Sequence, residues 1–258
     1  MQDFYALFYQ RVAHSAAHAE FCTRVFGINL CQHGFADEPQ LDALINALNL
    51  SAGSTVLDLG CGNGMISEYL ADRTGAEVTG LDYSLEAIAQ ARTRAQSDRL
   101  RFECGDINAL KLPPAAYDAI VLIDSIYFSS NYARTIRELG AALRPGGRLA
   151  FLYSYGHEPW LPKEEFPAEN LAPERTPLGA ALTANGFTFS TQDFTQRDYD
   201  LAQRRKTVLT EMRAQFEAED LMFVWDNRMG DANGVSSAVE DGLHRRYLYV
   251  CSLSSALD

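Results

Sequence analysis

Three glycines follow a short apolar run near residue 60, in an order that favours ligand binding by backbone atoms. The segment VLDLGCGNG, residues 56–64, runs from a strand-like sequence into Gly60, Gly62 and Gly64. Glycine is needed where a backbone approaches a ligand closely or takes a positive φ. The helix predicted to begin near Met65 offers unpaired N–H groups to an anion such as a carboxylate. The pattern therefore predicts a ligand site at the carboxyl end of this strand.

Acidic residues also follow the next two predicted strands. Asp82 ends the run 77–82, and Asp106 comes just after the run 100–104. A carboxylate at the tip of the second strand of a Rossmann-like sheet accepts hydrogen bonds from two ribose hydroxyls, so Asp82 is predicted to hold a ribose. Alternatively, the negative charge of Asp82 stabilises the N-terminal turn of the next helix. Tyr83 is predicted to lie against an adenine ring or, alternatively, to be an ordinary half-exposed aromatic.

The spacing of the glycines separates two classes of nucleotide-containing ligand. Nicotinamide dinucleotides bind a G-x-G-x-x-G turn, whereas this chain has G-x-G-x-G with Asp58 two positions before Gly60. A tight strand-to-helix turn without a ligand is the other alternative. The D-x-G-x-G-x-G pattern resembles motif I of the class I S-adenosylmethionine-dependent methyltransferases.

Three later segments resemble the same family, in the same order and at similar separations. Residues 102–107 are similar to the segment whose carboxylate takes the adenine amino group, and residues 117–128 resemble motif IV. Residues 143–147 resemble the turn before the fifth strand. The resemblance extends over roughly residues 50–155 and implies an enzyme that uses S-adenosylmethionine.

The resemblance also implies where this cofactor binds. Its methionine end is expected over Gly60 to Gly64, its ribose on Asp82, and its adenine near Asp106 and the Ile107 amide. Asp58 is expected to orient the glycine loop or to reach the cofactor's amino group through water. The full set of implied cofactor residues is Asp58, Gly60, Gly62, Gly64, Asp82, Tyr83, Asp106, Ile107 and Asp124.

His33 and Tyr127 are the predicted catalytic residues. Residues 26–35 are similar to a glycine- and histidine-containing turn in many small-molecule methyltransferases, whose N-terminal region covers the active site. His33 is predicted to act as a base or to bind the acceptor, with a histidine packed under the lid as the alternative. Tyr127 follows the fourth predicted strand and is expected to lie near the transferred methyl group. Methyl transfer from a sulfonium needs mostly alignment, so few catalytic residues are expected.

Aromatic residues are frequent in the segments that could enclose an acceptor. They could surround a cationic or conjugated molecule, or merely bury the underside of a cap. Besides Tyr127, they are Phe128, Tyr132, Tyr153, Tyr155, His157, Trp160, Phe223 and Trp225.

Strand and helix patterns alternate along the chain, and this alternation predicts the elements that position these residues. Between residues 55 and 154 this alternation predicts a Rossmann-like α/β domain with helices on both faces of a seven-stranded, mostly parallel sheet. The last strand, residues 245–253, is predicted to be antiparallel. Residues 1–50 are predicted to form an N-terminal helical lid. Residues 51–258 are predicted to form the methyltransferase domain, with cap insertions around 155–175 and 197–242.

Secondary structure can also be predicted for the segments before residue 55 and after residue 154. Helical patterns are expected at residues 3–26, 37–50, 177–186 and 198–223, with a polar stretch before the last strand and an irregular loop over 157–177.

Composition excludes several classes of partner. The net charge is −12, and no cluster of Lys and Arg could track a phosphate backbone, so nucleic acid is not expected as a partner. The five cysteines are scattered, and His14 and His18 lack a third ligand, so no metal site is predicted. Without a signal peptide or a transmembrane run, a cytoplasmic monomer or homodimer with no membrane partner is expected.

The predicted acceptor is a small molecule. Acid-rich loops could attract an amine, which favours N-methylation over O- or C-methylation. Two alternatives stay open: a protein that binds S-adenosylmethionine without catalysis, and a methyltransferase that acts on a protein or RNA.

Overall fold

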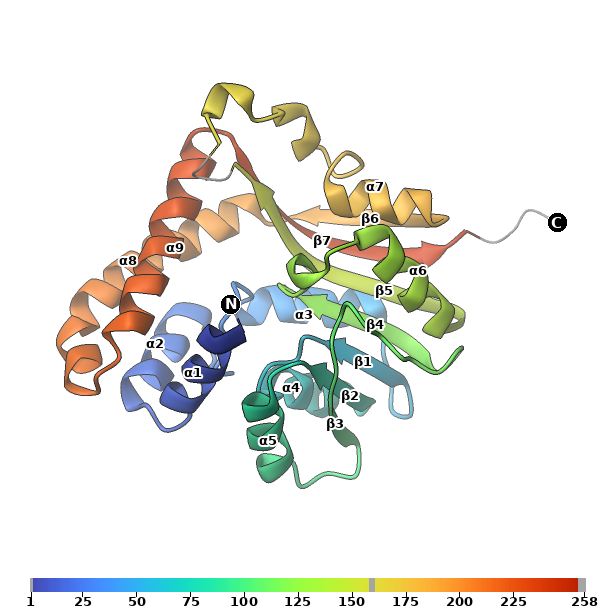
Figure 1. The fold of residues 1–258 in the computed structure, drawn as a ribbon, viewed down its shortest axis with the longest axis horizontal. Helices are drawn as coiled ribbons and strands as arrows, with labels where there is room; N and C mark the ends of the chain where they lie inside the picture. Colours follow the sequence, from blue (N-terminus) through green and yellow to red (C-terminus); the bar gives the residue numbers. More distant parts are fainter. Residues whose placement is uncertain (1, 158–160, 255–258) are drawn as a thin grey trace.

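The computed structural model describes residues 2–157 and 161–254, and in this part of the chain seven strands form one sheet (Figure 1). Their order is β3-β2-β1-β4-β5-β7-β6, with β7 antiparallel to both β5 and β6 and the other neighbours parallel. The strands are β1 (Thr55–Leu59), β2 (Glu77–Asp82), β3 (Leu100–Cys104), β4 (Tyr117–Ile123), β5 (Leu143–Gly156), β6 (Phe187–Asp193) and β7 (His244–Leu253). The predicted Rossmann-like sheet with an antiparallel last strand is confirmed.

The order of the strands places a crevice between β1 and β4. The chain starts at β1, moves outward through β2 and β3, and then returns to the other side of β1 with β4. At such a reversal the connections leave the carboxyl ends of two adjacent strands in opposite directions, which opens a ligand site there. The strand ends singled out in the sequence therefore meet at one edge of the sheet.

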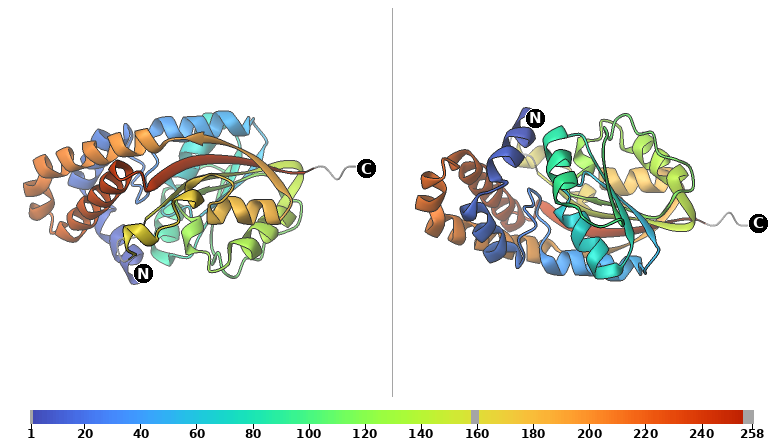
Figure 2. Two further views of the ribbon diagram at one scale, coloured as in Figure 1. Left: turned by 90° about the horizontal axis from the view of Figure 1, so that it is seen from above. Right: turned by 90° about the horizontal axis from the view of Figure 1, so that it is seen from below.

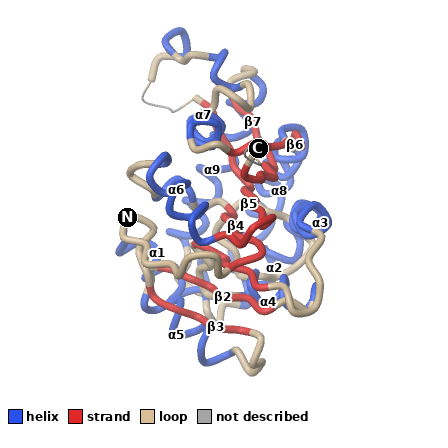
Figure 3. The backbone as a smooth tube through the Cα atoms, turned by 90° about the vertical axis from the view of Figure 1, so that its right-hand side faces the viewer, coloured by secondary structure: helices blue, strands red, loops and turns tan. Residues whose placement is uncertain are grey.

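Two layers of helices cover the sheet, with α6 and α7 on one side and α3 and α4 on the other (Figure 3). Alternate side chains of β4 pack on opposite faces of the sheet. Ile120 and Leu122 are buried against α6 and α7, and Val121 is buried against α3 and α4. Strands that are covered on both faces need such continuous apolar runs. The helices are α3 (Glu38–Leu48), α4 (Met65–Thr74), α5 (Leu85–Arg94), α6 (Tyr132–Ala142) and α7 (Pro177–Ala184).

Four further helices gather at one end of the sheet (Figures 1 and 2). They are α1 (Gln2–Val12), α2 (Ala16–Phe26), α8 (Thr195–Ala218) and α9 (Met222–Glu240). We call α8 and α9, which pack along each other, the helical arm. None of the helices in residues 2–157 and 161–254 has both the length and the apolar character needed to span a bilayer.

The helical pattern at residues 3–26 contains a break that was not predicted. Ser15 has extended φ and ψ angles of −76° and 117°, and its hydroxyl accepts a hydrogen bond from the His18 N–H. The same hydroxyl donates to Glu219 at the end of α8, whose carboxylate also accepts the Ala17 N–H. Ser15 therefore caps α2 and ends the preceding helical segment, since a serine that satisfies a free N–H favours a new helix start.

The segment before the last strand, which was predicted only to be polar, forms α9. About half of its side chains are apolar, but they form no regular stripe, and the buried ones include Arg228 and Ser236 beside Val224 and Ala232. Its helical form depends on packing along α8 rather than on an apolar stripe. In the expected irregular loop, Lys163–Glu165 and Ala168–Leu171 form short 3-10 turns, and Trp160 lies outside the described residues.

Gly64 and Gly146 allow a matched test of packing at a left-handed backbone position. Both have φ near +80°, but a Cβ on Gly64 would lie 2.5 Å from the Phe102 ring, whereas a Cβ on Gly146 would meet nothing within 4 Å. Gly146→Ala should cost about 1–2 kcal/mol of unfolding free energy, from backbone strain alone. Gly64→Ala should cost about 1–3 kcal/mol more, from overpacking. Urea denaturation measures both, and equal losses would contradict the packing argument.

Candidate active site

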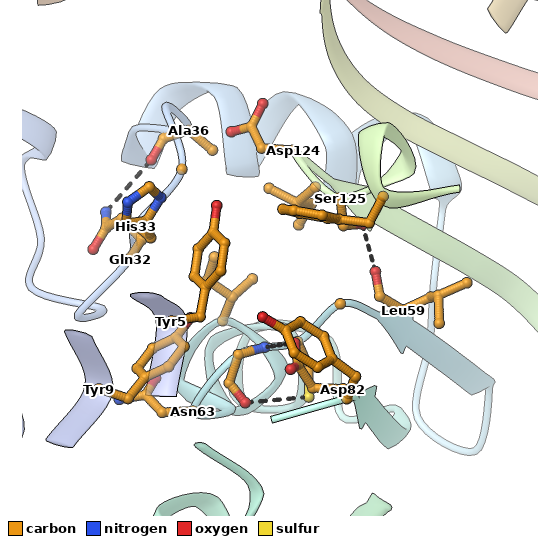
Figure 4. A pocket seen from close by; sticks show the side chains of 18 of the residues that line it. Tyr5, Tyr9, Gln32, His33, Ala36, Leu59, Asn63, Asp82, Asp124 and Ser125 are labelled. Atoms are coloured by element: carbon orange, nitrogen blue, oxygen red, sulfur yellow. Dashed lines mark hydrogen bonds between the residues drawn. The ribbon is translucent and has the colours of Figure 1, made fainter. Parts of the chain in front are cut away.

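A cavity of about 420 Å³ lies at the carboxyl ends of the strands, within the size range of small-molecule sites (Figure 4). One wall comes from the segments that follow β1, β2, β3 and β4, and the opposite wall comes from α1, loop 30–36 and α9. The predicted site residues that line it are His33, Gly60, Gly62, Asp82, Tyr83, Ile107, Asp124 and Tyr127. Asp58, Gly64 and Asp106 lie beside the cavity and do not line it.

The glycine loop takes the left-handed backbone that the sequence pattern predicts. The φ angles are 82° at Gly60, 57° at Gly62 and 81° at Gly64. A Cβ on Gly60 would lie 2.4 Å from the Cβ of Ser125, which follows β4. A Cβ on Gly62 would lie 2.1 Å from the hydroxyl of Tyr9 in α1. The space beside Gly62 was expected to hold ligand, and a tyrosine from the N-terminal helix fills it instead.

Asp82 joins the tips of the first two strands. Its two carboxylate oxygens accept the Gly62 N–H and the Ser84 N–H, each at 2.9 Å. Burial raises the pKa of Asp82, and the hydrogen bonds from backbone N–H groups oppose that rise. Each carboxylate oxygen has about two lone-pair sites, so acceptor capacity remains on the side that faces the cavity.

Asp58 and Asp106 make their hydrogen bonds outside the cavity. Asp58 is buried behind the glycine loop, where the Ser67 hydroxyl donates to it at 2.6 Å, and burial raises its pKa to about 7. Asp106 is exposed, and its Oδ1 accepts the Asn108 N–H at 2.8 Å. Its chain neighbour Ile107 lines the cavity. Asp58 therefore holds the first turn of α4, just after the glycine loop, while Asp106 lies next to the cavity-lining Ile107.

Asp124 links the sheet to loop 30–36. Its backbone is left-handed, with φ at 52°, a conformation that aspartate tolerates better than most residues. One carboxylate oxygen pairs with Arg246 at 2.7 Å, and the other accepts the Phe35 N–H at 2.7 Å. Arg246 is fully buried and also donates to Gln40 at the start of α3. The Asp124 carboxylate therefore fixes the loop that carries His33.

The helical arm holds the same loop from the other side. Arg228 of α9 donates to the carbonyl oxygens of Gln32, at 2.6 Å, and of His33. Arg205 of α8 lies 4.3 Å from the centre of the Phe35 ring. Both arginines are buried. The position of His33 is therefore set by residues about 170 to 195 positions away in the chain.

His33 is a neutral imidazole surrounded by aromatic rings. Its Nε2 lies 3.2 Å from Oδ1 of Asn227, an oxygen that only accepts, so Nε2 carries the hydrogen and Nδ1 has a free lone pair. Burial and the Arg228 charge hold the His33 pKa well below its usual range. Tyr5 meets the ring edge-on, with 4.9 Å between centroids. Figure 4 shows Tyr5 extending from α1 into the space between His33 and Asp124.

Tyr127 lies on the opposite wall. It is 40% exposed, its hydroxyl accepts the Ser154 N–H, and its ring stacks on Tyr153 with 5.2 Å between centroids. Phe128 also lines the cavity. The other aromatics that sequence reasoning placed near the acceptor and that the structure describes do not line it: Tyr132, Tyr153, Tyr155, His157, Phe223 and Trp225.

Several lining residues were missed by the sequence reasoning. Tyr5 and Tyr9 are four residues apart on α1, a spacing that places both on one face of a helix, and this signal could have found them. Asn227 and Asp231 have the same spacing on α9, but that helix was not predicted. Both pairs line the cavity.

Comparison with known proteins finds a family match for the central segment. Residues 56–147 match a sequence profile described as a methyltransferase domain. The chain is 33% identical over 148 residues to 27-O-demethylrifamycin SV methyltransferase of Amycolatopsis mediterranei, a match that covers 52% of this chain and 54% of that protein. The matches span about half the length of such curated relatives.

Two solved structures share the fold over almost the whole chain. Phosphoethanolamine N-methyltransferase 2 of Haemonchus contortus has a TM-score of 0.77 at 17% identity, covering 97% of this chain and 61% of that one. The [4+2]-cyclase SpnF has a TM-score of 0.72 at 21% identity, covering 97% and 96%. At these identities the likeness establishes the fold, and the chemistry must be argued from the site.

The buried Asp58 predicts a pH dependence of stability. Because its pKa is about 7 in the folded chain and near 3.8 when unfolded, the folded state holds an extra proton between these values. The stability contributed by that proton is present below pH 4 and is lost as the pH rises through 7. Asp58→Asn keeps an acceptor for Ser67 but cannot ionise, so it removes this loss.

The measurement is urea denaturation of both proteins from pH 5 to pH 8. The unfolding free energy of the unsubstituted protein should fall relative to Asp58→Asn by roughly 1 kcal/mol per pH unit up to pH 7. A difference between the two proteins that does not change with pH would show that Asp58 does not bind this proton.

Proposed function

We propose that this chain is a class I S-adenosylmethionine-dependent methyltransferase that transfers a methyl group from S-adenosylmethionine to a small molecule. The observation that carries the proposal is that the glycine loop and Asp82 line one cavity at the strand-order reversal. Aromatic side chains of α1 close that cavity on its other side. Such a cavity can hold a donor and a small acceptor side by side.

The residues present fit this cofactor. Gly60 and Gly62 line the cavity without side chains, but their N–H groups already donate to the Leu81 carbonyl oxygen and to Asp82. The first turn of α4, which has no side-chain cap, would therefore supply the N–H groups for the methionine carboxylate. Asp82 retains acceptor capacity for the ribose hydroxyls, and Tyr83 and Ile107 flank the position expected for the adenine. Asp106, Asp58 and Gly64 would support this half from outside the cavity. Asp124 would support it by holding loop 30–36.

The chain's own residues then have to orient the acceptor and exclude water. When bound, S-adenosylmethionine supplies a methyl group on a positively charged sulfur, which is a good leaving group. Tyr5, Phe128 and loop 30–36 line the cavity and would hold the acceptor in line with the methyl group while displacing water from its surface. His33, neutral and with Nδ1 free, can take a proton from an acceptor that must lose one. Tyr127 borders the cavity opposite His33 and would help to position the acceptor.

An amine is the favoured acceptor class, ahead of oxygen or carbon acceptors. Among the described residues, those that line the cavity include three aspartates and neither Lys nor Arg. A cavity with this charge pattern attracts cations and disfavours anionic groups. We further propose that residues 1–50 act as the lid of the site and that residues 51–258 form the transferase domain with its caps.

The proposal is tested by methyl transfer from labelled S-adenosylmethionine into a bacterial metabolite extract. We expect label in a small, extractable product, and not in protein or RNA. Label in a macromolecule would replace the small-molecule proposal with the macromolecular one. Tight binding of S-adenosylhomocysteine without any transfer would point to a protein that binds the cofactor without catalysis.

Asp82→Ala should weaken binding of S-adenosylhomocysteine by about 1.5–3 kcal/mol, because charge-assisted bonds to the ribose and the bond to the Gly62 N–H are lost. Isothermal titration calorimetry measures the change. Asp72→Ala is the matched control, because the Asp72 side chain is 75% exposed and does not line the cavity. An Asp82→Ala protein with unchanged affinity would remove Asp82 from the site.

His33→Gln should lower the rate of label transfer by about 10²–10⁴-fold if the acceptor loses its proton to His33. The affinity for S-adenosylhomocysteine should stay within about twofold, since His33 lies on the wall away from the glycine loop. His14→Gln is the control, because His14 is exposed. An unchanged transfer rate in His33→Gln would rule out a base at this position.

A further inference from the structure

Asp231 is a carboxylate of the cavity wall that has no partner within the described protein. It lies on α9, and among the described side chains of residues 4–157 and 161–254 no group donates a hydrogen bond to its carboxylate or pairs with it within 4 Å. Burial raises the pKa of Asp231, and the charges of Arg228 and Arg205 oppose that rise. An unpaired carboxylate that is largely removed from water is costly, so a partner from outside the protein is to be expected.

The other cavity carboxylates already have partners. Asp124 pairs with Arg246 and the Phe35 N–H, and Asp82 accepts two backbone N–H groups. The guanidinium of Arg228 donates to the carbonyl oxygens of loop 30–36 and not to Asp231. Asp231 is therefore the cavity carboxylate with both oxygens available to a ligand.

The surroundings of Asp231 suit an organic cation. Tyr5 and His33 meet edge-on, Phe128 meets Tyr5 with 5.5 Å between centroids, and Asn227 lies one helical turn before Asp231. Burial, followed by the Tyr83 and Asp231 charges, raises the pKa of Tyr5 to about 12, so its ring and hydroxyl stay neutral. Neutral aromatic rings next to a carboxylate bind ammonium groups through charge and cation–π attraction.

We propose that Asp231 binds an ammonium group of the methyl acceptor, and so determines that the enzyme selects cationic over neutral molecules of the same shape. The proposal rests on the proposed function, because it names the acceptor class of that site. The substituents of the cation would contact the Tyr5 and Phe128 rings, while Asn227 keeps His33 in its neutral tautomer.

The test compares two probes of nearly equal shape, choline and its uncharged isostere 3,3-dimethylbutan-1-ol. Each is titrated into protein saturated with S-adenosylhomocysteine, and binding is followed by calorimetry. We expect choline to bind about tenfold more tightly or better, as for a charge-assisted contact. Asp231→Asn should bring the two affinities to within about threefold of each other.

Two further variants keep the result interpretable. Asp226→Asn is the matched control, an exposed aspartate five positions earlier on the same helix, and it should retain the preference for choline. If Asp231→Asn does not fold, Asp231→Leu replaces it, because an apolar side chain of similar size needs no charge partner when buried.

The outcomes separate this inference from the proposed function. Equal affinities of the two probes in the unsubstituted protein, or an Asp231 variant that keeps the preference, would overturn the ammonium site. So would a loss of stability in Asp231→Asn with unchanged probe affinities, since Asp231 would then only balance the arginine charges. Failure of the unsubstituted protein to bind S-adenosylhomocysteine would instead overturn the proposed function itself.

Discussion

The left-handed backbone of the glycine loop is the constraint on which the site depends. Each glycine makes room for a different part of the chain: Gly60 for Ser125 after β4, Gly62 for Tyr9 of α1, and Gly64 for Phe102 of β3. Any side chain at these positions would be strained by its φ and would also collide. One loop of five residues thereby sets how closely the sheet and the N-terminal helix approach the same cavity.

Two buried arginines, Arg246 and Arg228, fix the conformation of loop 30–36, which carries His33. Arg246 is compensated by Asp124 and Gln40, while Arg228 is satisfied largely by backbone carbonyl oxygens of loop 30–36. Burying a guanidinium is costly unless its donors find good acceptors. The loop must therefore keep the conformation that supplies those acceptors. The cavity wall beside His33 is therefore held by ion pairs and hydrogen bonds of buried arginines as well as by apolar packing.

Much of the fold could be predicted because its signals are local. The strand runs, the glycine spacing and the acid at the tip of β2 are each contained within a few consecutive residues, and the structure has the predicted sheet. The contacts of Asp124 could not be predicted, because its partner Arg246 is 122 positions away. Helix α9 escaped prediction because it buries Arg228 where an apolar residue was expected. With α9 missing, Asn227 and Asp231 could not be placed at the cavity.

The hydrogen bonds from Arg228 to the carbonyl oxygens of loop 30–36 also bear on how a chain of this fold can change in evolution. The matched profile, residues 56–147, contains the glycine loop and Asp82, whereas the facing wall is encoded near both ends of the chain. Replacing either end by itself would leave buried carbonyl oxygens or a buried guanidinium unsatisfied, at about 1–3 kcal/mol for each group. The two ends should therefore be inherited and exchanged as one unit, and a chimera would have to carry both.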